Sequence, residues 1–311
     1  MKFYIYVLTV FASCFLFINK SYSQCACCAG AGIGSSNGDY NNGVLTLNKN
    51  KWVAEAYGDY RTIKDGPAPQ DEEKILKNMF IASLGIRYGV SKNLTISALT
   101  PFVFLHTKAG NDNGLGDLDL MATLKLYNKN NFNIAVQAGV ELPTGVKDSI
   151  SKFENVPLVV GSGSYDPMIG IIISKSWDKF ILQGNGLYKH TTNGFGKNYY
   201  GSLSVQNLTV TYKLKSMNNT CKTDSSKNNN SGKYGLSLFA GYYGEWLDKL
   251  KEDGVVDENS GHYSGFVTIG TNLSLKKFSF PITLSLPVIA NMNGLQNPPG
   301  YRLRLGLIRS F

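Results

Sequence analysis

The sequence predicts an all-β protein: a transmembrane up-and-down antiparallel β-barrel of about twelve strands, with long extracellular loops and mostly short periplasmic turns. Three observations support this fold class. The N-terminus carries an export signal, strand-like alternation runs through most of the chain, and the last strand, residues 301–311, ends on Phe311 itself. In that strand apolar and polar side chains alternate, as lipid-facing and water-facing residues do in transmembrane barrels.

The N-terminus predicts export. A positive start at Lys2 precedes an apolar stretch over residues 4–18 and small residues near Ser23, which indicates a signal peptide over residues 1–23. A lipoprotein-like cut at Cys14 is the alternative, but the apolar run continues past that cysteine. No later stretch approaches the ~20 apolar residues of a spanning helix. We therefore expect a Cys/Gly-rich periplasmic segment over residues 24–50 and an outer-membrane barrel over residues 51–311.

About twelve segments carry strand signals, and each is long enough to cross a bilayer when tilted. They cover residues 51–62, 79–90, 93–107, 116–127, 131–142, 165–176, 179–190, 199–214, 233–245, 263–276, 278–291 and 301–311. In residues 278–288, apolar side chains at even positions oppose mostly polar ones at odd positions. A soluble sandwich shows the same alternation, so the connections between the strands must decide between the folds.

The connections alternate between long and short along the chain. Only residues 215–232 break this rule. Tight periplasmic turns and long outer loops are typical of outer-membrane barrels, so this phase predicts a Gram-negative outer-membrane protein with both termini in the periplasm. Aromatic residues near the strand ends, Tyr199 and Tyr200 among them, predict two interfacial girdles.

The composition favours membrane and small-molecule partners over nucleic acid. The formal charge of the 311-residue chain is +9, but its lysines are scattered over turns and loops. A nucleic-acid surface would need a basic patch. We therefore expect as partners a lipid bilayer, a small solute and, through the C-terminal Phe311, the outer-membrane assembly machinery.

A family resemblance starts at Gly114-Leu115-Gly116-Asp117. Pro143-Thr144-Gly145, Gly161-Ser162-Gly163-Ser164 and Asp166-Pro167 follow in the same order. Over residues 114–175 the chain resembles the outer-membrane transporter-like barrels associated with the meta-pathway of phenol degradation. This resemblance implies passage of small hydrophobic or aromatic molecules across the outer membrane.

The polar faces of the strands supply candidate channel residues. We expect the following to line the lumen or contact substrate: Arg87, Asp119, Lys125, Gln137, Glu141, Arg302 and Arg304. Asp117 and Asp166 should lie at the rim, either as turn residues beside glycine or as an acidic rim that selects cations. No catalytic residues are predicted. A barrel-embedded lipid hydrolase that uses His262 and Ser264 is the weakest alternative.

The cysteines suggest a second function. Cys25, Cys27 and Cys28 follow the signal, and Cys221 should lie on the same side of the membrane. Thiolates in this density suit a soft metal, which would make the chain a metal-handling outer-membrane protein. An oxidising periplasm favours disulfides or an acylated anchor instead. His106, His190 and His262 are isolated at expected rim positions, so no resident cofactor is predicted apart from that possible soft metal.

Overall fold

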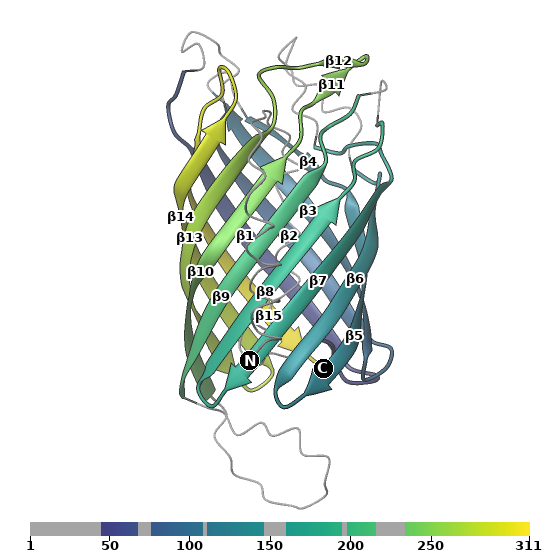
Figure 1. Ribbon diagram of the computed structural model, residues 1–311, viewed down its shortest axis with the longest axis vertical. Helices are drawn as coiled ribbons and strands as arrows, with labels where there is room; N and C mark the ends of the chain where they lie inside the picture. Colours follow the sequence, from purple (N-terminus) through teal and green to yellow (C-terminus); the bar gives the residue numbers. More distant parts are fainter. Residues whose placement is uncertain (1–44, 68–75, 108–110, 146–159, 195–197, 216–233) are drawn as a thin grey trace, which may run out of the picture.

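The computed structural model of the chain describes residues 45–67, 76–107, 111–145, 160–194, 198–215 and 234–311. Within them, twelve antiparallel strands close into one barrel (Figure 1), as the sequence predicts. Their bounds are β1 Trp52–Ile63, β2 Leu76–Gly89, β3 Leu94–Thr107, β5 Leu118–Lys129, β6 Phe132–Leu142, β7 Asp166–Trp177, β8 Phe180–Lys189, β9 Leu203–Lys215, β10 Tyr234–Leu247, β13 His262–Leu275, β14 Phe278–Met292 and β15 Pro299–Ser310. Strand β1 pairs with β2 and with β15, which joins the first strand of the barrel to the last.

Three short strands lie in connections where no strand is expected. Strand β4 (Asn111–Leu115) pairs with the part of β3 from Phe102 to His106. Strands β11 (Lys251–Glu252) and β12 (Val255–Val256) form a small hairpin between β10 and β13. No helix among the described residues is long and apolar enough to span a bilayer.

The two ends of the barrel differ in their connections. At one end, here called the turn end, two-residue turns join β5 to β6, β7 to β8 and β13 to β14. Asn130 and Asn131 of the first turn both have positive φ, 52° and 59°, as primed hairpin turns require. Longer connections, with β4, β11 and β12, lie at the opposite end, here called the loop end (Figure 1). The long connection over residues 216–233 lies outside the described residues.

Side chains alternate between the two faces of the closed sheet. Leu84 and Ile169 on the outer face are 64% and 65% exposed, whereas Gln137 and Ser174 on the inner face are 4% and 1% exposed. Large apolar side chains therefore cover the outside and many polar ones the inside. A two-sheet sandwich is excluded because a single sheet closes on itself.

The prediction that Tyr199 and Tyr200 lie at a strand end and belong to an interfacial girdle is wrong. Strand β9 begins at Leu203, so Tyr199 and Tyr200 precede it instead of lying within it. Tyr199 makes only isolated bridges to Asn193 and Lys251, and Tyr200 is buried against Leu203 and Leu247. Tyr200 therefore packs with side chains of the inner wall, and the Tyr199 hydroxyl accepts a hydrogen bond from the Ser202 N–H in the segment before β9. The Tyr199 hydroxyl donates to Asp248, and burial raises the pKa of that hydroxyl.

Candidate functional site

Most inward-facing charges gather at one depth of the barrel. Asp59 lies seven residues from the turn end of β1, Arg302 eight from that of β15 and Glu141 nine from that of β6. Neighbouring strands have the same tilt and the same rise per residue, so positions equally far from the turn end lie at similar depth. These charges therefore form a belt, here called the charged belt, in the half of the barrel nearer the loop end. Below the belt the inner face is mostly neutral and polar, with residues such as Thr123, Asn185 and Thr209.

One arc of the belt is centred on Arg302. Its guanidinium makes two hydrogen bonds to the carboxylate of Glu245 on β10, one of them 3.0 Å long. The same guanidinium lies 4.0 Å from the ring centroid of Phe266 on β13. A bidentate ion pair with a cation–π contact fixes an arginine in one orientation. Arg302 is therefore a rigid part of the wall.

Asp59 on β1 connects this arc to two further arginines. Its Oδ2 accepts hydrogen bonds from Arg304 at 2.6 Å and from Arg61 at 2.9 Å. Nearer the turn end, Arg87 Nε lies 3.3 Å from Glu55 Oε2. At the level of the belt, three arginines face the two carboxylates of Asp59 and Glu245. This arc, here called the arginine arc, carries one net positive charge.

The opposite arc is acidic. Asp119, Glu141 and Asp166 are direct cross-strand neighbours on β5, β6 and β7. Lys189 on β8 is fully buried and donates to both oxygens of Glu141, at 2.9 and 3.0 Å. With Asp117 nearby, four carboxylates meet one ammonium, which leaves three formal negative charges on this acidic arc. Five strands lie between β7 and β15 in either direction around the ring, so the two arcs lie on opposite walls.

Asp117 holds a loop at the loop-end mouth. Its carboxylate accepts hydrogen bonds from the Gly145 N–H at 2.8 Å and from the Ser162 hydroxyl at 2.7 Å, as well as from the Ser162 N–H. Gly145 and Gly161 lie so close that a Cβ on Gly145 would stand 2.7 Å from the Gly161 Cα. Asp117 therefore joins both described ends of the β6–β7 connection to the barrel wall.

Apolar side chains share the inner wall with the charges. One cluster contains Met121, Met168, Leu187, Tyr200, Leu203, Val205 and Leu247. A second contains Leu76, Met79, Ile81, Val103, Leu105 and Val160. Met121, Met168 and Leu187 each lie two residues from a member of the acidic arc, so the charged belt and the first cluster are at nearly the same depth.

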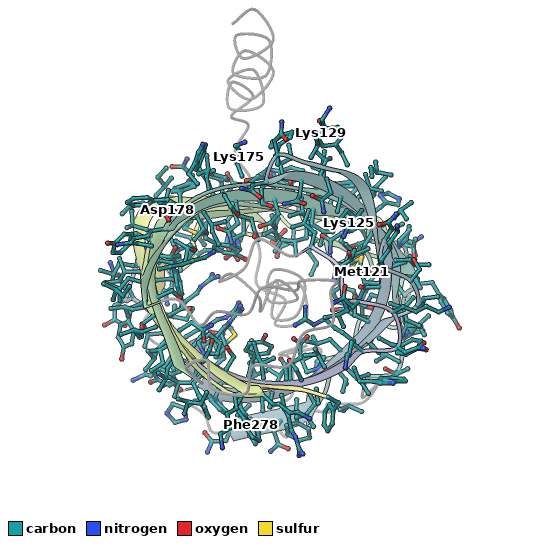
Figure 2. The ribbon with its side chains drawn as sticks, turned by 90° about the horizontal axis from the view of Figure 1, so that it is seen from below. Met121, Lys125, Lys129, Lys175, Asp178 and Phe278 are labelled. Carbon is teal, nitrogen blue, oxygen red and sulfur yellow. The ribbon has the colours of Figure 1, made fainter. Side chains whose placement is uncertain are left out.

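The predicted lumen residues all face inward but do not form one site. Asp119, Glu141, Arg302 and Arg304 belong to the belt, while Gln137 lies below it and donates to Thr123. Lys125 is near the turn-end opening, on the inner side of the wall in Figure 2, where Met121 also lies. Asp166 is fully buried, and one of its oxygens accepts from the Thr192 N–H.

Four charged residues of the two arcs were not predicted from the sequence. Asp59, Arg61, Lys189 and Glu245 are each 3% exposed or less, yet none was among the expected lining residues. Period-two alternation could have found Asp59 and Arg61, because both lie at odd-numbered positions of β1, on the same face as the inward Glu55.

The remaining candidates do not form a site among the described residues. In the described ranges, no three His, Cys, Asp or Glu side chains are grouped to hold a metal ion. His262 lies 3.6 Å from Glu245, and the Ser264 hydroxyl has no hydrogen-bond partner in the described structure. A His262–Ser264 hydrogen bond, which a hydrolase would use, is therefore absent. Cys25, Cys27, Cys28 and Cys221 lie outside the described residues.

The comparisons with known proteins agree with this architecture. The family described as "Putative MetA-pathway of phenol degradation" matches residues 78–276, well over half of the chain, so the chain belongs to that family. An outer membrane channel from Pseudomonas putida F1 has 17% sequence identity and a TM-score of 0.65, with 86% of this chain and 98% of that chain covered.

Two further solved barrels are less similar. LpxR from Salmonella typhimurium has 10% identity and a TM-score of 0.43, covering 82% of this chain and 99% of its own. The β domain of the Bordetella autotransporter BrkA has 8% identity and a TM-score of 0.48, covering 84% and 99%. No curated protein matches the sequence at a significant level. The fold is that of an outer-membrane β-barrel, as in the Pseudomonas putida channel.

Proposed function

We propose that the chain is a channel of the Gram-negative outer membrane that passes small solutes without covalent chemistry, and that apolar or aromatic solutes are its main cargo. The observation that carries the proposal is the apolar cluster on the inner wall. Porin lumens are polar, because water fills them. Here Met121, Met168 and Leu187 face the interior at the depth of the charged belt.

Size and chemistry support this cargo class. A barrel of twelve strands falls between eight-stranded barrels, which side chains fill, and sixteen-stranded porins, which hold an aqueous channel. Methionine adapts its shape to different apolar partners and makes favourable contacts with aromatic rings. The arginine arc keeps a net positive charge and the acidic arc a net negative charge. A free ion of either sign is therefore repelled by one of the two walls, whereas an uncharged molecule is not.

Export and orientation complete the proposal. We infer that residues 1–23 are removed as a signal peptide and that both termini face the periplasm. Strand β1 begins and β15 ends at the turn end, and short periplasmic turns are usual in this class of barrel. The C-terminal Phe311 would then be presented to the periplasmic assembly machinery.

The test is uptake of radiolabelled naphthalene by a Gram-negative host that produces the protein, beside liposome swelling in sugars. We expect faster naphthalene uptake and little swelling. The double substitution Met121→Asp, Leu187→Asp should slow uptake about tenfold or more, because an apolar solute would have to pass two ionised groups. The control, Thr209→Asp with Thr211→Asp, adds the same charges at inward polar positions of β9 and should leave uptake nearly unchanged.

Three results would count against the proposal. Rapid sugar entry that exceeds naphthalene uptake would indicate an aqueous pore. Neither uptake nor swelling would indicate a closed scaffold. Release of fatty acid from labelled lipid, lost in His262→Ala, would indicate a hydrolase.

A further inference from the structure

The outer surface of the turn end is strongly basic. The outward-facing and turn residues described there include these basic side chains: Lys49, Lys51, Lys92, Lys129, Lys175, Lys179, Lys276, Lys277 and Arg309. Among the described side chains of that surface, only Asp178 is acidic. The loop end differs, because Asp65, Asp248, Asp253, Asp257 and Glu258 balance its lysines. Among the described residues, the net positive charge of the outer surface is therefore concentrated at the turn end.

Two of these lysines flank one aromatic residue. Lys129 on β5 is the cross-strand neighbour of Phe132 on β6, and Phe132 is the cross-strand neighbour of Lys175 on β7. Adjacent strands are about 4.8 Å apart, so the two lysine backbones stand about 10 Å apart with Phe132 between them. Figure 2 shows both lysines on the outer side of the wall. Their flexible side chains are long enough for both ammonium groups to reach one anion above Phe132.

Lys175 is held close to the turn by a contact with a neutral group. Lys175 Nζ donates to the backbone carbonyl of Asn130 at 2.8 Å, which keeps it beside the β5–β6 turn. An ammonium group has three protons, so that contact uses one and leaves two. Residues 128–133 and 172–177 contain no Asp or Glu. A bound anion would thus complete the contacts of Lys175.

Neighbouring aromatic rings place these lysines at the level of the lipid head groups. Phe132 packs edge-on against Tyr127, with ring centroids 6.0 Å apart. Phe180 packs against Tyr212 at 4.9 Å, and the nearby Trp177 is half exposed. Such rings mark the boundary between hydrocarbon and water in transmembrane barrels. Lys129 and Lys175 extend from this boundary toward the phosphate groups.

We propose that Lys129 and Lys175 form a binding site for the phosphate group of an anionic phospholipid in the leaflet at the turn end. Phe132 and Tyr127 contact the first part of its acyl chains. The ligand is a lipid because the site combines two cations with an apolar, outward-facing floor, and a soluble anion would make no use of that floor. Clustered basic residues at a membrane surface attract anionic lipids in this way. The proposal is independent of what the barrel transports.

The test uses the full chain reconstituted in phosphatidylcholine vesicles. Brominated phosphatidylglycerol, or brominated phosphatidylcholine, is titrated in, and quenching of tryptophan fluorescence, to which Trp177 beside the site contributes, reports binding. We expect a preference for phosphatidylglycerol that weakens as salt is added. The variant K129Q/K175Q should reduce that preference by on the order of tenfold. K129R/K175R, which keeps both charges, should retain it.

Matched controls separate this site from general attraction. K64Q/K77Q removes two exposed lysines at the loop end and should leave the preference unchanged. Equal quenching by both lipids, an unchanged preference in K129Q/K175Q, or an equal loss in K64Q/K77Q would overturn the proposal. So would displacement of the lipid by inorganic phosphate beyond that by chloride at the same ionic strength, because the ligand would then be free phosphate. Heat-dependent gel mobility checks that each variant is folded.

Discussion

Leu284→Arg tests whether the outer face of the barrel meets hydrocarbon. Leu284 is the seventh of fifteen residues in β14 and lies between Ile269 of β13 and Leu303 of β15. Its neighbours along the strand, Ile282 and Leu286, are 44% and 47% exposed on the same face. An arginine at the midplane of the lipid face of a barrel costs about 2–4 kcal/mol. We expect the free energy of unfolding to fall by that amount.

The control needs an arginine on the inner face. Ser285, next to Leu284, is unsuitable because its cross-strand neighbour is Arg302, and a second arginine there would add like-charge repulsion. Gln137 is better, because it faces inward near the middle of β6 beside Gly170, which has no side chain. Gln137→Arg should cost well under half as much as Leu284→Arg. Urea unfolding in lipid vesicles, followed by tryptophan fluorescence, measures both. Equal losses of stability would refute the assignment of faces.

Two further predictions concern the hydrogen bonds that Asp117 accepts at the loop end and the N-terminal cysteines. Asp117→Asn should lower the free energy of unfolding by about 1.5–3 kcal/mol for each charge-assisted hydrogen bond lost to Gly145 or Ser162. The control Asp65→Asn, on an exposed loop, should change it little. Equal unfolding midpoints for the two variants would contradict the role of Asp117 in holding the loop. For the mature protein purified from an oxidising compartment, we expect few free thiols before reduction and no change in zinc or copper content in Cys27→Ser, Cys28→Ser, by elemental analysis. A stoichiometric metal lost in that variant would favour the metal-handling alternative.

The strands of this barrel were predictable from sequence because each obeys a local rule. Alternation and turn residues mark all twelve, and the order of long and short connections predicts closure between β1 and β15. Strand β4 was not predictable, because residues 111–115, Asn-Asp-Asn-Gly-Leu, have little intrinsic preference for strand. That segment extends because the protruding part of β3 offers it hydrogen-bonding groups. The extended conformation of residues 111–115 is therefore set by their pairing with β3 and not by local strand preference.

The interior was less predictable than the wall. Lys189 was assigned no role, because a lysine at the end of a strand usually faces solvent. Here Glu141, 48 residues earlier in the chain, accepts its hydrogen bonds, and only the pairing of β6 with β7 and of β7 with β8 brings the two together. The same holds for Arg302 and Glu245, which are 57 residues apart. Sequence periodicity gives the face of each charge but not its partner across the sheet.

The seam between β1 and β15 has a consequence for biogenesis. The Phe311 amide donates to the Trp52 carbonyl, and β1 pairs with β15 along its length, so the hydrogen bonds that close the barrel join its first strand to its last. No partial chain can complete that seal, and pairings across such a sequence separation form slowly. Until synthesis and secretion are finished, two strand edges remain open to other polypeptides. A chain that lacks β15 would therefore keep β1 and β14 as unpaired edges and could not form the closed barrel.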